Sequence, residues 1–293
     1  MRDKVHDLST VVATIPDGAV IGLGGLSMNS VPMALVREIV RQGKKNLTVV
    51  ALVAGMPIDW LAAVGAVERV ITGLVSLEGF GLAQNFRRAV QGGSIAIEEY
   101  SEHLLICRLQ AQSHRLPFVP TRAGLGTDIL KLHSHSRAVR EEIDPVTGES
   151  YVACSRLPVD IALVHCHEVD RLGNARVNPK LIWMDNELVN AADRTIVSSE
   201  SIIETDEFRS EPWRTTYPSF MTESVTCVPW GALPTSMFQV YSHASGFYER
   251  YSRACEDERT FITFFNKYIV EPETWQDFLR VNNLGELHKQ NEN

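Results

Sequence analysis

Apolar residues in the first third of the chain fall into short runs that are separated by amphipathic stretches. Four runs have the length and composition of buried strands: residues 19–25, 46–54, 69–78 and 94–100. Between the first two runs, the segment "MALVREIVRQG" predicts a helix with an inner face of Leu35, Val36, Ile39 and Val40 and an outer face of Arg37, Glu38 and Arg41. Strands that alternate with helices predict an α/β fold with a mainly parallel sheet flanked by helices.

The pattern continues through the rest of the chain. Residues 101–114 should form a helix and residues 117–124 a fifth strand, whereas the polar segment 140–150 is typical of an exposed hairpin. Later apolar stretches predict further strands. From about Gly246 the chain is amphipathic and rich in aromatic residues, which indicates helices packed on a core.

A loop rich in glycine, "GLGGLSMNSVP" (residues 22–32), joins the first predicted strand to the first helix. Glycine costs conformational entropy and adds no packing, so such a loop indicates a need for bare backbone. Ligands of parallel sheets bind at the carboxyl ends of the strands, where this loop and "RAGLGTD" (residues 122–128) are expected. Backbone amides before a helix N-terminus suit an anion or an oxyanion. A tight strand-to-helix turn is the structural alternative.

Two known phosphate-binding motifs do not fit this loop. A dinucleotide fingerprint needs a third spaced glycine and an acidic residue at the end of the second strand, and a P-loop needs Gly-Lys followed by Ser or Thr.

Composition and charge narrow the function classes. The chain has 293 residues and a formal net charge of -8, from 28 Lys and Arg against 36 Asp and Glu, which argues against nucleic acid as a partner. No run of Lys or Arg suits a membrane surface, and the N-terminal stretch lacks the apolar run of a secretion signal. The five scattered cysteines are typical of reduced thiols, so we expect a cytoplasmic protein. One domain is expected over residues 1–285, with a frayed tail at 286–293.

The glycine loop also carries a resemblance. "PDGAVIGLGGLSMNSVP" resembles the glycine signature of family I CoA-transferases, with Leu26 and Ser30 in place of the usual Phe and Gly. The matching residues are Asp17, Gly18, Gly24, Gly25 and Pro32. Further segments resemble glutaconate-type A subunits over about residues 15–245, in order: "LPFVPTRAGLGTD", "VDIALVHCHEVDRLGNARV" and "VPWGALPTS". The resemblance implies the CoA-transferase-like α/β fold.

The resemblance also implies a partner chain. These enzymes use a glutamate nucleophile, typically within a Ser-Glu-Asn-Gly stretch of the B half. In this chain Glu102, Glu200 and Glu211 each follow a serine, but Asn-Gly follows none of them. The chain therefore resembles an A subunit that needs a separate B (beta) subunit, in a heterotetramer that takes an acyl-CoA thioester as its substrate and binds no cofactor.

Within that resemblance, the glycine loop supplies three candidate substrate-binding residues, Gly24, Gly25 and Ser27. The amides of the two glycines would stabilise oxygen charge at the acyl centre or orient the substrate there. The implied reaction transfers CoA from an acyl-CoA thioester to a carboxylate acceptor.

Glu102, at the start of the predicted helix 101–114, is the candidate catalytic residue. The resemblance places an amide here in transferases and a glutamate in a related steroid-ring-opening CoA hydrolase, where Arg122 also matches an arginine. In a closed pocket Glu102 would act as a general base, and Arg122 would bind a substrate carboxylate. A ring-opening CoA-thioester hydrolase, or a decarboxylase, is therefore the first alternative function. The structural alternative is a first-turn glutamate that complements the helix dipole and pairs with Arg122.

Two histidine pairs, His133 with His135 and His165 with His167, share one face if they lie on strands. No third ligand stands at a fitting spacing, so no metal site is expected. A non-catalytic acyl-CoA-binding protein is the alternative from a different functional class.

Overall fold

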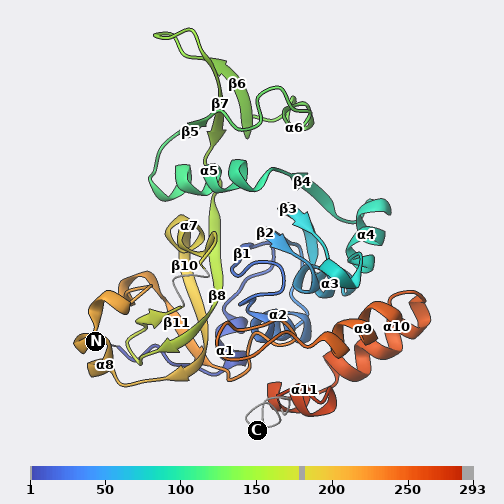
Figure 1. The fold of residues 1–293 in the computed structure, drawn as a ribbon. Helices are drawn as coiled ribbons and strands as arrows, with labels where there is room; N and C mark the ends of the chain where they lie inside the picture. Colours follow the sequence, from blue (N-terminus) through green and yellow to red (C-terminus); the bar gives the residue numbers. More distant parts are fainter. Residues whose placement is uncertain (1, 178–181, 286–293) are drawn as a thin grey trace.

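A mainly parallel sheet forms the centre of the computed structural model, which describes residues 2–177 and 182–285 (Figure 1). The strands lie in the order β11, β10, β8, β1, β2, β3 and β4, and the short β9 pairs antiparallel with β8. Their bounds are β1 (Val20–Leu23), β2 (Leu47–Ala54), β3 (Val67–Val75), β4 (Ala96–Glu99), β8 (Val159–Val169), β9 (Ala175–Arg176), β10 (Ala192–Ile202) and β11 (Ser224–Cys227). The predicted α/β fold with a mainly parallel sheet is confirmed.

Helices cover both faces of this sheet. Successive residues of a strand point to opposite faces, and here both faces carry apolar side chains. Val49 and Ala51 of β2 belong to one apolar core, and Val50 and Leu52 belong to the other. The first core is covered by α1 (Leu8–Ala13), α2 (Met33–Arg41), α3 (Met56–Ala63), α4 (Gln84–Gln91), α9 (Ser245–Ala254), α10 (Glu258–Phe265) and α11 (Trp275–Val281). The second core is covered by α5 (Glu102–Ser113) and α7 (Asp185–Ala191).

The remaining elements are short. They are α8 (Thr205–Ser210), the 3₁₀ turns η1 (Glu78–Phe80), η3 (Pro212–Arg214) and η4 (Ser219–Met221), and the π-helical turn η5 (Asn266–Val270). None of the helices in the described part of the chain is long and apolar enough to cross a membrane. The domain expected over residues 1–285 stays a prediction, and the tail at 286–293 lies outside the described residues.

A separate antiparallel sheet projects beyond α5, as the green segment at the top of Figure 1 shows. It consists of β5 (Phe118–Thr121), β6 (Val139–Ile143) and β7 (Ser150–Ser155), with α6 (Ile129–Leu132) beside it. The predicted hairpin at 140–150 is confirmed as the β6–β7 turn. The prediction that the fifth strand continues the parallel alternation is wrong, because β5 pairs antiparallel with β7. The loop at 122–128 therefore does not follow a strand of the main sheet, but it packs beside the first turn of α5, since a Cβ atom on Gly124 would lie 3.3 Å from Leu104 Cδ1.

The prediction that Arg37 and Glu38 face outward is wrong as well. They are 1% and 6% exposed, because the C-terminal helices cover this face of α2. Arg37 Nε donates to the Ile269 carbonyl over 2.7 Å, Arg37 Nη2 donates to the Pro272 carbonyl, and the guanidinium carbon lies 5.2 Å from the ring centre of Phe278. Burial lowers the pKa of Arg37 to about 10. The pattern of apolar residues in α2 could not show that carbonyl groups near Ile269 and Pro272 accept hydrogen bonds from Arg37.

A buried carboxyl group ties α3 to α4 and α9. Asp59 Oδ2 accepts from Asn85 Nδ2 over 2.8 Å and from the Tyr251 hydroxyl over 2.6 Å, and Asp59 Oδ1 accepts from the Phe86 amide over 2.8 Å. Asp59 is 0% exposed, and this burial raises the pKa of its carboxyl group despite the three hydrogen bonds.

We predict that Asp59→Asn flattens the pH dependence of folding stability. In the wild type, the unfolded carboxyl loses its proton from about pH 4 upward while the folded one keeps it. The folded state then binds more protons, so the free energy of unfolding falls as pH rises through this window. Urea unfolding from pH 4 to 7 measures the effect, with Asp193→Asn, an exposed aspartate, as the control. Parallel wild-type and Asp59→Asn profiles would contradict the prediction.

Candidate functional site

The glycine loop follows β1 at the carboxyl edge of the sheet, and both of its central amides are already engaged. The Gly24 amide donates to the Leu163 carbonyl over 2.8 Å. The Gly25 amide donates to Asp185 Oδ1 over 3.0 Å. In this conformation neither N–H group is available to a substrate oxygen, so the expected oxyanion contact from these two amides is not formed. The part of these residues in substrate binding stays a prediction.

Glycine is required at both positions because neighbouring atoms approach the backbone. A Cβ atom on Gly24 would lie 2.5 Å from Asp185 Oδ1, and one on Gly25 would lie 2.5 Å from the Asn29 carbonyl oxygen. Gly25 also has a φ of 78°, which side chains disfavour. Asp185 itself is buried, and burial raises the pKa of its carboxyl group. No sequence motif pointed to Asp185 as the acceptor for the loop.

Ser27 joins the glycine loop to the turn after β3. Its amide donates to the Val53 carbonyl over 2.8 Å, and its hydroxyl donates to Glu78 Oε1 over 2.5 Å. Both residues have left-handed backbone conformations, with φ values of 54° for Ser27 and 55° for Glu78. Strain of this kind at two bonded residues is typical of functional sites. Glu78, which the sequence analysis missed, therefore adds a second exposed carboxylate to this edge.

Residues 228–241, called here the 228–241 segment, hold the other side of the glycine loop. The Ser236 amide donates to the Met28 carbonyl, and the Ser30 amide donates to the Ser236 carbonyl, each over 2.7 Å. The Ala34 amide, in the first turn of α2, donates to the Gly231 carbonyl over 2.9 Å. This amide of the helix N-terminus is thus satisfied by the protein's own backbone.

Glu102 lies at the same carboxyl edge, on the first residue of α5, and is exposed. Its stem packs against β3, since a Cβ atom on Gly73 would lie 3.2 Å from Glu102 Cγ. Leu74, the next residue of β3, pairs with Val53, whose carbonyl binds Ser27, so Glu102 and the glycine loop approach the same end of β2 and β3. No hydrogen bond or ion pair joins the Glu102 carboxylate to another side chain of the described residues. The closed pocket expected around Glu102 is not formed by this chain alone.

Arg122 points to the projecting sheet. Its guanidinium is 77% exposed and pairs with Glu149 over 3.3 Å. The ion pair between Arg122 and Glu102 in the structural alternative is therefore wrong for this conformation. The backbones are nevertheless close, because His103 Nε2 and Thr121 Oγ1, on the neighbouring residues, are 3.1 Å apart.

The histidine pairs do not converge on a common point. His165 contacts Ser198 and Glu200, whereas His167 Nε2 donates to the Phe238 carbonyl over 2.9 Å. Across residues 2–177 and 182–285, no group of three His, Cys, Asp or Glu side chains is placed to hold a metal ion.

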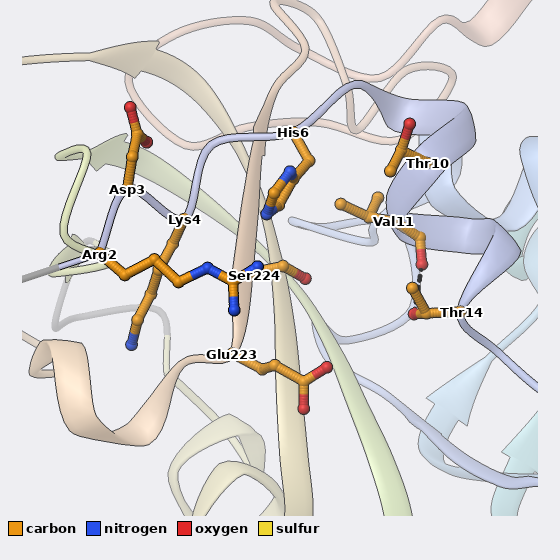
Figure 2. A pocket seen from close by; sticks show the side chains of 9 residues that line it. All are labelled: Arg2, Asp3, Lys4, His6, Thr10, Val11, Thr14, Glu223 and Ser224. Carbon is orange, nitrogen blue, oxygen red and sulfur yellow. Dashed lines mark hydrogen bonds between the residues drawn. The ribbon is translucent and has the colours of Figure 1, made fainter.

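A cavity of about 520 Å³ lies at the opposite edge of the sheet, beside Ser224 at the start of β11. Figure 2 shows the side chains that line it, among them those of Arg2, Lys4, His6 and Glu223. Lys4 Nζ already donates to the Thr222 carbonyl over 2.6 Å. Ligands of parallel sheets bind at the carboxyl edge, so the glycine loop, and not this cavity, marks the candidate active site.

Comparison with known proteins gives matches over most of the chain. The family model described as Coenzyme A transferase matches residues 5–227. The cholesterol ring-cleaving hydrolase IpdA subunit of Rhodococcus jostii is 31% identical over 274 residues, which cover 92% of this chain and 92% of that protein. An uncharacterized protein of Archaeoglobus fulgidus is 33% identical over 284 residues, and this chain spans 62% of its length.

A solved structure shows the same fold over nearly the whole chain. The crystal structure of glutaconate coenzyme A-transferase from Acidaminococcus fermentans matches with a TM-score of 0.89 and 25% sequence identity. The match covers 97% of this chain and 93% of that one.

We predict that Gly25→Ala destabilises the protein by about 3 kcal/mol, because a left-handed conformation and a backbone clash both oppose the methyl group. Gly65→Ala is the matched control, since Gly65 has a φ of 60° but open space around it. That variant should lose only about 1 kcal/mol. Chemical denaturation of both variants gives the difference, and equal losses would show that close approach of the backbone is unimportant at Gly25.

Proposed function

The chain belongs to the coenzyme A transferase family, and from this premise we propose that it is the A subunit of a heteromeric CoA-transferase. The enzyme moves CoA from an acyl-CoA thioester to a carboxylate acceptor. The partner is a B subunit that carries the nucleophile, and the assembly is a heterotetramer. CoA enters as substrate, no separate cofactor is needed, and the reaction takes place in the cytoplasm.

The observation that carries this proposal is the open carboxyl edge of the sheet. The glycine loop, Glu78 and Glu102 converge there from the ends of neighbouring strands, yet Glu102 is exposed rather than enclosed. No glutamate of the chain stands in the Ser-Glu-Asn-Gly context of the family's nucleophile. A second chain that covers this edge would enclose the site and supply the nucleophile that this chain lacks.

The reaction then runs in balanced steps. The partner's carboxylate attacks the thioester carbonyl, the thiolate of CoA leaves, and a mixed anhydride forms. The thiolate attacks the enzyme's own carbonyl in the anhydride, which gives an enzyme-CoA thioester and releases the first carboxylate. The acceptor carboxylate reverses these two steps and leaves as the new thioester.

This chain contributes positioning to those steps. Because Gly24 and Gly25 have no side chains, the loop packs closely on Asp185 and on the Asn29 carbonyl, and the bonded loop keeps the shape that positions the substrate. The Ser27 hydroxyl donates to Glu78, which leaves the oxygen of Ser27 free to accept a hydrogen bond from the substrate. Arg122, whose guanidinium is exposed, binds a substrate carboxylate once it turns from Glu149.

Glu102 favours a second candidate function, hydrolysis of a ring in a CoA thioester. An exposed carboxylate at this edge, with no ion-pair partner among the described residues, is placed to activate water once a partner encloses it. The relatives include the cholesterol ring-cleaving hydrolase subunit described above.

We predict that the purified chain alone has no acyl-CoA turnover and that its co-expressed partner restores it. The reason is the open edge, which leaves the site without a nucleophile. Acyl-CoA consumption is measured for the chain, the partner and the complex, and the mass of the complex tests the heterotetramer. Full activity of the lone chain would contradict the two-subunit proposal, and acyl-CoA binding by the complex without turnover would favour a binding protein.

We predict that Glu102→Gln keeps most of the turnover of the complex, because the partner's glutamate performs the chemistry of a transferase. Loss of a general base costs about 10²- to 10⁴-fold, so a fall of that size would instead support the hydrolase. Glu68→Gln is the matched control, since Glu68 is exposed near the start of β3, at the opposite end from the part of that strand on which Glu102 packs. Turnover and acyl-CoA affinity are measured together, because a base acts on turnover far more than on affinity.

A further inference from the structure

Glu200 and His165 form a hydrogen-bonded pair beneath the 228–241 segment, and the proposed mechanism uses neither. His165 Nε2 and Glu200 Oε1 are 2.7 Å apart. The side chain of His165 is 0% exposed and that of Glu200 is 12% exposed. Glu200 lies near the carboxyl end of β10, and His165 lies on the adjacent β8. Buried polar groups of this kind need complete hydrogen bonding, so their partners show what they hold.

Glu200 accepts hydrogen bonds from two residues of the 228–241 segment in addition to His165. The Tyr241 hydroxyl donates to Oε1 over 2.5 Å, and the Trp230 amide donates to Oε2 over 2.7 Å. Burial alone would raise the pKa of Glu200, but the hydrogen bonds and the charge of His165 outweigh it and hold that pKa below its usual value. Glu200 is therefore an ionised acceptor at neutral pH.

A catalytic role for this cluster does not fit the geometry. The Ser198 hydroxyl lies 2.8 Å from His165 Nδ1, so Ser198, His165 and Glu200 follow the order of a hydrolytic triad. However, Ser198 is 0% exposed, in the middle of β10 and between two neighbouring strands. No substrate reaches its oxygen, and the cluster must act through what it binds.

The cluster fixes the first part of the 228–241 segment closely. The Tyr241 hydroxyl accepts from the Ala232 amide over 3.0 Å, so one side chain joins both ends of the segment. The Val228 amide donates to the Ser199 carbonyl over 2.8 Å. A Cβ atom on Gly231 would lie 2.6 Å from His165 Cε1, so the imidazole packs directly on the backbone there.

The same segment holds the glycine loop from the other side. Ser236 exchanges backbone hydrogen bonds with Met28 and Ser30, and its hydroxyl lies 2.6 Å from Asn29 Oδ1. Hydrogen bonds at both ends of the 228–241 segment, joined by its covalent backbone, thus connect Glu200 to the loop.

We propose that Glu200 and His165 are positioning residues that hold the glycine loop in its working shape through the 228–241 segment. The contacts between Glu200, the 228–241 segment and the glycine loop do not depend on the proposed function, but their effect on turnover rests on it. Removing the Glu200 carboxylate leaves three buried donors without an acceptor, so the segment has to move. A displacement of about 1 Å at a site costs on the order of 10²-fold in rate.

The test compares Glu200→Ala with Glu200→Gln in the complex with the partner subunit. Glutamine can accept from the Trp230 amide with its oxygen, and its NH2 group can donate to His165 Nε2, once the ring hydrogen lies on Nδ1 beside Ser198, and to the oxygen of the Tyr241 hydroxyl. We expect Glu200→Ala to lower kcat about 10²-fold and Glu200→Gln to retain most of it. Glu204→Ala, an exposed glutamate just beyond β10, is the matched control and should behave as wild type.

Hydrogen exchange provides a readout that does not depend on turnover. In Glu200→Ala, exchange should be faster by about tenfold or more both in the 228–241 segment and in residues 24–30. Faster exchange in the segment alone, with residues 24–30 still protected, would overturn the proposal. If the wild-type complex shows no turnover, the proposed function fails while the exchange result still decides the positioning role.

A milder variant covers the case in which Glu200→Ala does not fold. Tyr241→Phe removes one donor to Glu200 and keeps the aromatic ring, whose centre lies 4.8 Å from that of Trp230. We expect a smaller rise of exchange in the same two regions. Unchanged exchange in residues 24–30 would again overturn the proposal.

Discussion

The backbone of residues 24–30 is the constraint on which the candidate site depends. Its amides donate to a carbonyl of β8, to the buried carboxyl of Asp185 in α7, to a carbonyl of β2 and to a carbonyl of the 228–241 segment. Four parts of the chain, far apart in sequence, must therefore be in place before the loop has its shape. Because each bond is buried or close to buried, an error in any one of them leaves a polar group unsatisfied.

The arrangement separates rigid parts of the site from adaptable ones. The glycine loop and the 228–241 segment are joined to the sheet by buried groups, whereas Glu102 and Arg122 are exposed, and Arg122 is held by an exposed ion pair with Glu149. A rigid backbone with adjustable side chains suits a site whose remaining lining residues come from another chain. The position of reacting groups is then set by this chain, and the closure is set by its partner.

The sequence predicted the main sheet because its strands fall in short apolar runs, and the structure has β1, β2, β3 and β4 at the expected places, although the edge strand β4 is largely exposed and not buried. It also placed the glycine loop at the carboxyl edge. It failed where a distant segment decides the outcome. Arg37 is charged and was expected in solvent, but the carbonyls near Ile269 and Pro272 bury it. β5 is only four residues long and pairs with a neighbouring hairpin instead of the sheet.

The site was predictable in the same uneven way. Composition cannot reveal that an amide in a glycine loop is already bonded, because its acceptor, Asp185, lies 160 residues away. The sequence singles out Glu200 only as a glutamate that follows a serine without the Asn-Gly of the nucleophile motif. A signal was present, since His165 is a polar residue within the apolar strand β8, and Glu200 is a carboxylate that follows the buried part of β10. Polar residues in such strands need partners, and two of them on separate strands suggest each other.

The projecting sheet has a consequence for how this protein can vary. Phe118 and Ser155 are paired in register, so the chain leaves the body and returns to it at nearly the same place. The chain then re-enters the main sheet as β8, which pairs parallel with β1. The exposed turn between β6 and β7 can therefore be lengthened, shortened or exchanged, while the strand order and the glycine loop stay as they are. Descendants of one ancestral chain could in this way acquire new substrates through one insertion point, with the core of the fold inherited unchanged.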